Sequence, residues 1–178
     1  MDITEFVEHS LGRWRSQRSA HHLAFRHFEE VLSTIDIVSL DVQNSAVIEL
    51  CKSYGFDPAM AVSPFHMSWE GESDWDEEET LEGSTILVPI PNSEDPRRGK
   101  LLRDRGYAET IPAAAEYHFL EDGTFVLVSS YERAAAEEKI WFATPNLRFR
   151  ASSIKTSDGE GVITASFSSE IRSVSPKE

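Results

Sequence analysis

Eight segments typical of β-strands follow one another after Pro64, and residues that favour turns separate them. They are SPFHMSWEG, STILVPIP, GKLLRDRGYAET, AEYHFLE, TFVLVSSYER, KIWFA, LRFRASSIKT and GVITASFSSEIRSV. Clear turns lie at Glu121–Gly123, Thr144–Asn146 and Asp158–Gly161, where Gly, Asn, Asp and Pro supply the backbone angles that hairpins need. A meander of this length has two exposed edges unless it closes on itself. The sequence therefore predicts a closed up-and-down antiparallel β-barrel.

Two further strands and two helices precede this run. GRWRSQRSAHHL, residues 12–23, and FEEVLSTIDIVSL, residues 28–40, bring the total to about ten strands, enough to enclose a cavity for one small ligand. A short N-terminal helix, TEFVEHSL, has Thr4 as its expected N-cap. One inserted helix covers SAVIELCKSY, residues 45–54. Cys51 lies on its apolar stripe, so we expect a packed thiol and not a nucleophile.

Length and composition fit a mainly β protein of one domain over residues 1–178. The chain has 178 residues, of which 40% are hydrophobic, and this suffices for one sizeable core. Its start, MDITEFVEHS, is acidic where a signal peptide is basic and then apolar, and no run of apolar residues is long enough for a membrane helix. The single cysteine excludes an internal disulfide. We expect a cytoplasmic protein without membrane insertion.

The charge balance limits the partners. The chain carries 31 acidic and 17 basic residues, a net charge of -14, which argues against nucleic acid because phosphate binding depends on clustered Lys and Arg. Any bound anion must be held by local arginines. In strand alternation neither face of GRWRSQRSAHHL is apolar, whether the face of Trp14, Arg18 and His22 or that of Arg15 and His21, so we expect the inner face of this strand to meet something polar.

Two strands carry candidate ligand contacts. In SPFHMSWEGESDW the odd-numbered positions share one face, so Met67, Trp69 and Trp75 form a flat, polarizable wall suited to a conjugated ligand. The alternative, which spacing alone favours, is that Phe65, Met67 and Trp69 are ordinary core residues. In NLRFR, Arg148 and Arg150 project side by side with the spacing to clamp carboxylates. The alternative is a pair of solvated surface arginines. If the two lie inside, we expect their carboxylate partners to arrive with the ligand.

No metal site is predicted. Metal sites built on strands need ligands that share a face, whereas the adjacent His21 and His22 point to opposite faces. No Cys or His pair has metal-ligand spacing either.

A family resemblance joins these motifs. The pair Gly12 and Trp14 after a short helix is similar to the lipocalin and calycin signature, in which an arginine of the last strand, here Arg172, covers the tryptophan. Together with MSWEGESDW, KLLRDRGYAET and EEKIWFATPNLRFR, the stretch GRWRSQRSAHHL resembles the S-type phycobiliprotein chromophore lyases, a calycin family. The resemblance covers the chain from Phe6 to about Arg172.

The resemblance implies a lyase that attaches an open-chain bilin, by a thioether, to a cysteine of a phycobiliprotein. It implies contacts to the propionates, the pyrrole N–H groups and the rings of the bilin. By role these are Arg148 and Arg150 with Arg18 in support for the propionates, Glu138 or Asp74 as the catalytic carboxylate at the pyrrole nitrogens, and Met67, Trp69, Trp75 and Trp141 as walls. Glu138 and Trp141 have opposite parity, so both face the ligand only if the strand bulges near Lys139.

The same resemblance implies the partners. They are a phycobilin, either phycocyanobilin or phycoerythrobilin, and the alpha or beta subunit of an apo-phycobiliprotein in a cell that contains phycobilisomes. The bilin is the substrate, and no cofactor is expected. The sequence leaves open whether the chain is a monomer or a homodimer. The alternative functions are a lipocalin-like carrier of a hydrophobic anion without attachment activity and an acidic scaffold that only docks phycobiliprotein subunits.

Overall fold

Ten strands, two α-helices and two short 3-10 helices make up the computed structural model of the chain, which describes residues 1–73, 80–104, 114–130, 134–156 and 161–173. In chain order they are α1 Ile3–Ser10, β1 Gly12–His22, η1 Leu23–Phe25, β2 His27–Ser39, α2 Ser45–Ser53, η2 Pro58–Met60, β3 Phe65–Ser73, β4 Thr80–Pro91, β5 Arg98–Arg103, β6 Ala115–Phe119, β7 Phe125–Ser130, β8 Ala134–Thr144, β9 Leu147–Thr156 and β10 Val162–Arg172.

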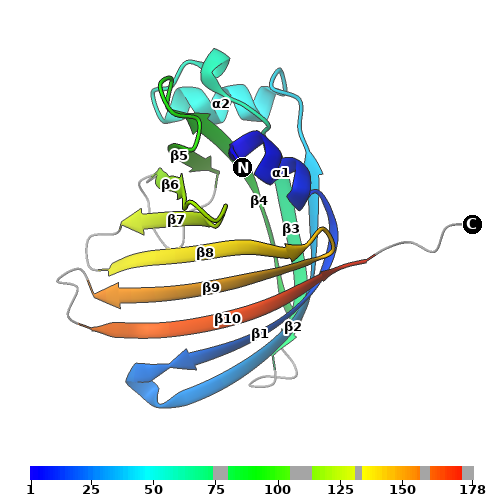
Figure 1. The fold of residues 1–178 in the computed structure, drawn as a ribbon, viewed down its shortest axis with the longest axis vertical. Helices are drawn as coiled ribbons and strands as arrows, with labels where there is room; N and C mark the ends of the chain where they lie inside the picture. The colour runs from blue at the N-terminus through cyan, green and yellow to red at the C-terminus, as the bar shows by residue number, and fades with distance from the viewer. Residues whose placement is uncertain (74–79, 105–113, 131–133, 157–160, 174–178) are drawn as a thin grey trace, which may run out of the picture.

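The strands form one closed antiparallel barrel (Figure 1). Each strand pairs with its neighbours in the chain, and β1 pairs with β10 to complete the ring in the order β1-β10-β9-β8-β7-β6-β5-β4-β3-β2. The predicted up-and-down barrel is therefore confirmed. An open sheet of these strands would have two exposed edges, and the pairing of β1 with β10 removes both.

The N-terminal helix α1 packs on one end of the barrel. Its cap is Asp2 and not Thr4: the Asp2 carboxylate accepts from the backbone N–H of Glu5, and the Glu5 carboxylate accepts from that of Asp2. This reciprocal capping box fixes the helix start two residues earlier than expected. The apolar face of α1 then inserts Phe6 into the aromatic core, where it stacks on Phe125 at a centroid distance of 4.3 Å.

Trp14 closes the same end of the barrel. Its side chain is 0% exposed, and its indole Nε1 donates to the carbonyl oxygen of Ser10 at 2.8 Å. The guanidinium carbons of Arg172 and Arg148 lie 4.3 and 4.5 Å from the centroid of its ring. Arg172 also donates to the carbonyl oxygens of His9 and Leu11 at the end of α1. The tryptophan and arginine of the calycin signature thus join the first strand, the last strand and the helix.

The second helix, α2, covers the outer face of β4 and β5. Val47 and Cys51 pack against Val88 and Leu102, and all four side chains are fully buried. Burial raises the pKa of the Cys51 thiol. The prediction of a packed cysteine is confirmed. Neither this helix nor any other among the described residues is long and apolar enough to span a bilayer.

We expect replacement of Trp14 by Ala to lower the free energy of unfolding by about 3 to 5 kcal/mol, because it removes a fully buried indole and empties the space between α1 and two arginines. Trp14→Phe keeps most of the ring and loses the Nε1 hydrogen bond, so its loss should be smaller. Denaturant unfolding of the two variants and wild type measures both values. Unchanged stability of Trp14→Ala would show that the indole does not hold this end together.

Candidate functional site in the barrel interior

The interior of the barrel changes character along its axis. The half next to α1 is filled by an apolar core in which Trp14, Ile35, Phe65, Tyr117 and Phe125 are buried. Beyond that core many inward positions are polar, although apolar residues such as Val31 and Leu127 lie among them. The polar positions include Ser16, Arg18, Glu29, Ser33, Arg103, Ser129, Glu138, Arg150, Ser152, Ser166, Ser168 and Glu170. Several of these side chains keep partial exposure, so water reaches the polar half of the interior.

A chain of charges crosses this interior from strand to strand. Glu170 on β10 lies between two arginines of β9: the Nε of Arg148 donates to its Oε2, and the Nε of Arg150 donates to its Oε1 at 3.1 Å. Arg150 continues to β8, where its Nη1 donates to Glu138 Oε1 at 2.7 Å. Alternation along the strands places all four side chains inside. Three neighbouring strands therefore share one ion network.

The network is driest at Arg148 and Glu170, which are each 1% exposed. Burial lowers the pKa of Arg148 to about 10, although the Glu170 carboxylate opposes this shift. Burial alone would raise the pKa of Glu170, but the charges of Arg150 and Arg148 outweigh it, and the pKa of Glu170 falls below its ordinary value. The pair is therefore ionised at neutral pH. Arg150 and Glu138 are wetter, with 20% and 29% of their side chains exposed.

The expectation that the ligand supplies the partners of Arg148 and Arg150 is wrong. Both arginines share one face, as the alternation in NLRFR predicted, and that face is the inner one, but Glu170 and Glu138 already pair with them. A guanidinium buried to this degree needs a carboxylate within the protein, because leaving the charge unpaired is strongly unfavourable. The Nη2 atom of Arg148 is buried and has no hydrogen-bond partner among the described residues.

Arg18 occupies the neighbouring position on β1. In the pairing register, Arg18 lies opposite Ser168, and Ser168 lies opposite Arg150, so the two arginines flank one serine on adjacent strands. Their Cα atoms are two strands apart, about 10 Å. Arg18 faces inward, is half-buried, and forms no ion pair or hydrogen bond with any residue that the structure describes. Its guanidinium is therefore not neutralised by any carboxylate that the structure describes.

Met67 and Trp69 lie on the inner face of β3, next to the apolar core. The indole of Trp69 lies over Gly83 of β4, where a Cβ atom would approach the Trp69 Cζ2 to 2.4 Å. A glycine is therefore required opposite the ring. The other two predicted contacts of this region, Asp74 and Trp75, lie outside the described residues.

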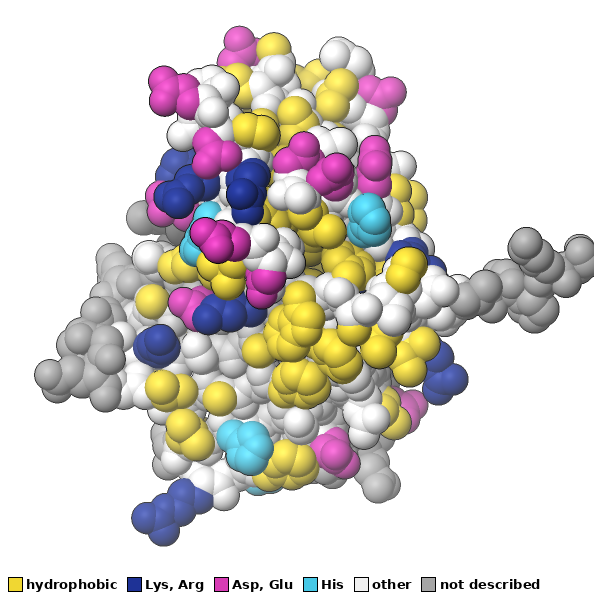
Figure 2. All heavy atoms as spheres, in the orientation of Figure 1, with side chains coloured by type: hydrophobic (Ala, Val, Ile, Leu, Met, Phe, Trp, Pro, Cys, Tyr) yellow, Lys and Arg dark blue, Asp and Glu magenta, His cyan; other side chains and the backbone are white. Residues whose placement is uncertain are grey.

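The prediction that Trp141 faces the interior is wrong. The ladder between β8 and β9 is regular through Lys139, and its irregularity falls later, between Phe142 and Thr144. Without a bulge, Glu138 points inward and Trp141 points outward. Trp141 packs against Phe149 and Phe167, with ring centroids 5.6 and 6.3 Å away, on the outer face of β8 to β10. Figure 2 shows hydrophobic side chains gathered over these strands.

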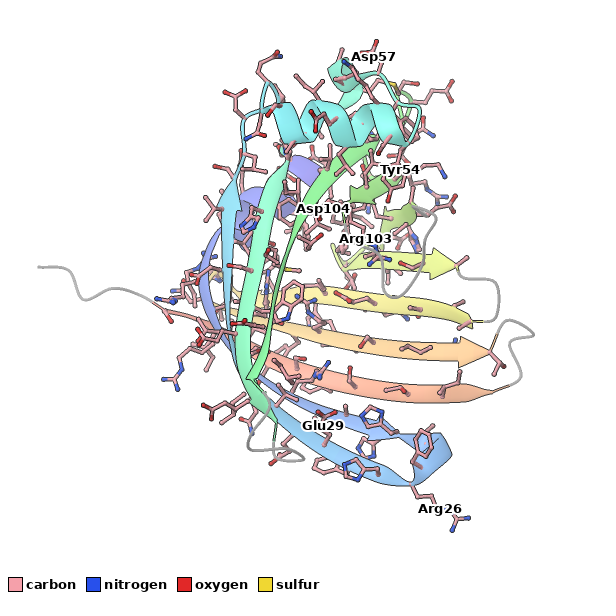
Figure 3. All side chains as sticks on the ribbon, turned by 180° about the vertical axis from the view of Figure 1, so that it is seen from behind. Arg26, Glu29, Tyr54, Asp57, Arg103 and Asp104 are labelled. Carbon is pink, nitrogen blue, oxygen red and sulfur yellow. The ribbon has the colours of Figure 1, made fainter. Side chains whose placement is uncertain are left out.

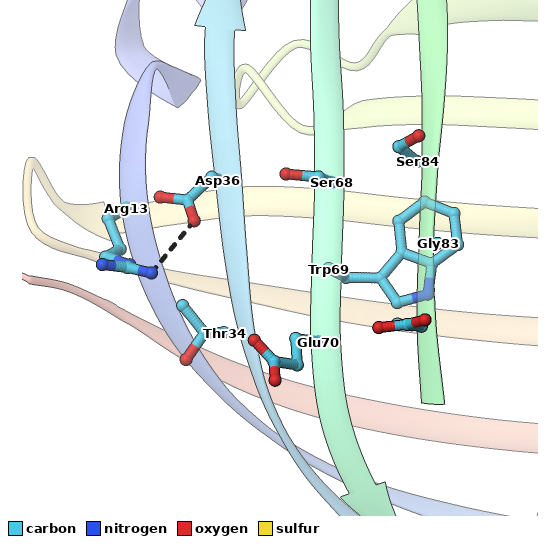
Figure 4. A pocket seen from close by; sticks show the side chains of 9 residues that line it. Arg13, Thr34, Asp36, Ser68, Trp69, Glu70, Gly83 and Ser84 are labelled. Carbon is cyan, nitrogen blue, oxygen red and sulfur yellow. Dashed lines mark ion pairs between the residues drawn. The ribbon is translucent and has the colours of Figure 1, made fainter. Parts of the chain in front are cut away.

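The outer face of β1 to β4 has a hollow of its own, of about 470 Å³ (Figure 4). Arg13 at its edge pairs with Asp36 at 3.3 Å, and Glu70 and Glu82 line the rest. Three carboxylates against one paired arginine make this hollow unfavourable for an anion. The interior contrasts with it: its inward charges, in the part of the chain that the structure describes, are four arginines (Arg18, Arg103, Arg148, Arg150) and three glutamates (Glu29, Glu138, Glu170).

Comparison with known proteins agrees with this architecture. The family described as CpeS-like protein matches residues 2–173. The chain belongs to the CpeS-like family. It is 66% identical over 173 residues to chromophore lyase CpcS/CpeS 3 of Trichodesmium erythraeum, covering 97% of this chain and 100% of that protein.

Two further relatives extend the comparison. Phycocyanobilin lyase subunit CpcS of Picosynechococcus sp. is 40% identical over 164 residues, which cover 92% of this chain and 83% of the relative. The solved structure of the S-type phycobiliprotein lyase CPES from Guillardia theta is 52% identical and superposes with a TM-score of 0.86, covering 99% of this chain and 95% of that one. The overall fold of this CpeS-like chain is therefore shared with a solved relative.

Sequence reasoning missed Glu170 and Arg103. Glu170 has the inward parity of Ser168, but only the register between β9 and β10 shows that it lies opposite Arg148. Arg103 faces inward from the end of β5, and its Nη2 donates to the Ser129 hydroxyl at 3.1 Å. The sequence KLLRD contains a pattern that could have indicated this, because strand alternation puts Arg103 on the same face as Leu101. Among the described residues, no group of His, Cys, Asp and Glu could hold a metal ion.

Replacement of Glu170 by Gln should lower the free energy of unfolding by about 3 to 5 kcal/mol, because it leaves Arg148 charged and buried without its carboxylate. The double variant Glu170→Gln with Arg148→Met removes the stranded charge and should recover much of that loss. Denaturant unfolding of wild type, both single variants and the double variant gives the coupling energy. A double variant as unstable as the sum of the single ones would contradict the buried pair.

The same carboxylate predicts an acid-dependent loss of stability. The folded-state pKa of Glu170 is lower than its ordinary value of 4.5, so the unfolded chain binds the proton first and stability falls as the pH drops below about 4.5. Glu170→Gln should flatten this part of the stability curve between pH 7 and 3. Parallel curves for the variant and wild type would assign the acid sensitivity to other carboxylates.

Proposed function

We propose that this CpeS-like chain is a phycobiliprotein chromophore lyase. Residues 1–178 act as one lipocalin-like domain that binds a phycobilin in the polar half of the barrel and promotes its thioether attachment to a cysteine of an apo-phycobiliprotein subunit. The observation that carries the proposal is the pair Arg18 and Arg150, which flank Ser168 inside the barrel of a protein with net charge -14. Fixed cations in a partly dry interior favour an anionic ligand of matching size.

Arg18 and Arg150 bind the two bilin propionates in this account. Arg18 has no partner among the described residues, and Arg150 is partly exposed while it contacts Glu170 through Nε and Glu138 through Nη1. Arg148 acts indirectly: it packs on the Trp14 ring and binds Glu170, and Glu170 in turn orients Arg150. The buried Nη2 of Arg148 is the one point at which it would meet a ligand directly.

Glu138 is our candidate for the carboxylate that hydrogen-bonds the pyrrole N–H groups. It faces inward, keeps 29% of its side chain exposed, and has one oxygen, Oε1, engaged by Arg150. A carboxylate at the ring nitrogens would hold the tetrapyrrole protonated and limit its torsions. Asp74, the alternative for this role, stays a prediction, as does Trp75. Met67 and Trp69 provide apolar surface for the rings.

The reaction is addition of the acceptor thiol to the double bond of the ring A side chain. The sulfur bonds to the exocyclic carbon, and the proton of the thiol ends on the neighbouring ring carbon. The lyase contributes no nucleophile, which agrees with the burial of Cys51. It accelerates attachment by holding an extended bilin with ring A at the open end of the barrel and by suppressing additions at other carbons. Both phycocyanobilin and phycoerythrobilin, and both the alpha and the beta subunit, fit this description.

The direct test mixes the purified protein with phycocyanobilin, records the absorbance, and then adds an apo-phycobiliprotein subunit. We expect a red-shifted complex first and colour that survives denaturation of the acceptor afterwards. Bilin binding without such colour would make the protein a carrier and contradict attachment. Subunit binding without any bilin spectrum would make it a scaffold.

Arg18→Gln should weaken bilin binding by about 1.5 to 3 kcal/mol, because it removes a charge-assisted contact to a propionate. The stability of the empty protein should hardly change, since Arg18 has no partner among the described side chains. A free bilin coils and absorbs mainly in the near ultraviolet, so the variant should also show a lower red to near-ultraviolet ratio at saturation. Absorbance titration measures both quantities.

The matched control is Arg15→Gln, on the same strand but on its outer face. It makes the same change of charge and should leave affinity and spectrum as in wild type. Equal losses in both variants would attribute the effect to net charge, and wild-type affinity in Arg18→Gln would remove Arg18 from the site.

A further inference from the structure

The basic stretch of β1 continues beyond the ligand site. Residues 9–28 contain no Asp or Glu, although the chain has 31 acidic residues, and they contain four arginines. These are Arg13, Arg15, Arg18 and Arg26. The proposed bilin site uses only Arg18, and Arg13 pairs with Asp36 on the outer face. Bilin binding therefore does not explain why the end of this stretch, with Arg26, contains no acidic residue.

This end forms a projecting turn that we call the hairpin arm, residues Leu23–Phe28. Strands β1 and β2 pair out to His22 and His27, and Arg26 closes the turn with a left-handed φ of 51°. The last described pair between β2 and β3 is Val31 with Ser73, so the arm extends past the described part of β3. Figures 1 and 3 show the hairpin at the end of the molecule opposite to α2, with Arg26 at its tip.

Three large apolar side chains of the hairpin arm face solvent. Phe25 is 80% exposed, and Leu23 and Phe28 are 48% and 47% exposed. Phe28 makes an edge contact with the His21 ring, which holds it on the surface. Single exposed apolar residues need no explanation, but a cluster of three on a short projecting turn marks an interaction site. Arg26 beside them is the only formal charge of the arm at neutral pH.

We propose that the hairpin arm docks the acceptor protein, through an apolar pocket of that protein flanked by carboxylates. This proposal rests on the proposed function, because it assumes that a protein thiol must reach ring A. Apolar side chains beside an arginine, in a stretch with no carboxylate from residue 9 to residue 28, complement such a surface. The arm lies at the end of the barrel opposite to α1, and the proposed function has the thiol enter from this end.

Two other occupants fit less well. A second copy seated on the arm would stand across the opening through which bilin and thiol pass. An anionic membrane surface would repel a protein with net charge -14. The acceptor is the occupant whose binding and reaction both need this end.

The test compares Phe25→Ser with Ile171→Ser, which alters an outer residue of β10 that is 59% exposed. Attachment of phycocyanobilin is followed as a function of the concentration of apo-phycobiliprotein. For Phe25→Ser we expect the half-saturating acceptor concentration to rise about tenfold, from loss of one buried phenyl ring in the complex. The bilin spectrum and the attachment rate at saturating acceptor should match wild type, and Ile171→Ser should match wild type throughout.

A second variant tests the charge. Arg26→Asn keeps a residue that tolerates the left-handed backbone and removes the cation. It should raise the half-saturating acceptor concentration a few-fold at low salt and by less at high salt.

Several outcomes would overturn the docking role. These are wild-type acceptor dependence in Phe25→Ser, an equal effect in Ile171→Ser, loss of the bilin spectrum in Phe25→Ser, or a dimer of wild type that Phe25→Ser dissociates without any change in attachment. Absence of attachment by wild type itself would instead contradict the proposed function. The two failures are therefore distinguishable.

Discussion

The buried pair of Arg148 and Glu170 ties the closure of the barrel to the chemistry of its interior. Both side chains are 1% exposed, and either charge buried without the other would strongly destabilise the fold. Arg148 also lies against Trp14, which holds α1 to the first strand. On its other side Glu170 orients Arg150, which faces the open half. Disturbing this pair disturbs the end of the barrel and the ligand site together.

The barrel interior has an apolar half and a polar half along its axis. The charge balance inside the barrel also differs from that of the chain as a whole. The half next to α1 is a dry aromatic core, and the other half is lined with serines, arginines and glutamates. Inside, arginines slightly outnumber glutamates among the described residues, whereas the chain as a whole has a net charge of -14. An anion therefore gains most from the interior, while the acidic outer surface keeps the protein apart from other anions.

Much of the architecture was predictable because alternation and turn chemistry act locally. The strands, the closed barrel and the packing of Cys51 followed from residue types and spacing, the position of Trp14 at the barrel end was implied by the family resemblance, and the alternation in NLRFR left open whether Arg148 faces inward. Strict alternation places Trp141 on the opposite face from Glu138. The prediction that both face the ligand required a bulge near Lys139, and it is wrong because the strand is regular there.

The partners of the arginines could not be predicted in the same way. Glu170 is 22 residues from Arg148, and only the pairing register brings the two side chains together. The same register decides which inward arginine has no carboxylate opposite it. For this reason Arg18, expected in a supporting role, has no ion-pair partner among the residues that the structure describes.

The most direct test is a crystal structure of the protein with phycocyanobilin bound. The account predicts an extended tetrapyrrole in the polar half of the barrel, with its propionates within hydrogen-bond distance of Arg18 and Arg150 and its pyrrole N–H groups facing Glu138. A bilin seated on the outer face, against Trp141 or in the hollow beside Arg13, would contradict it.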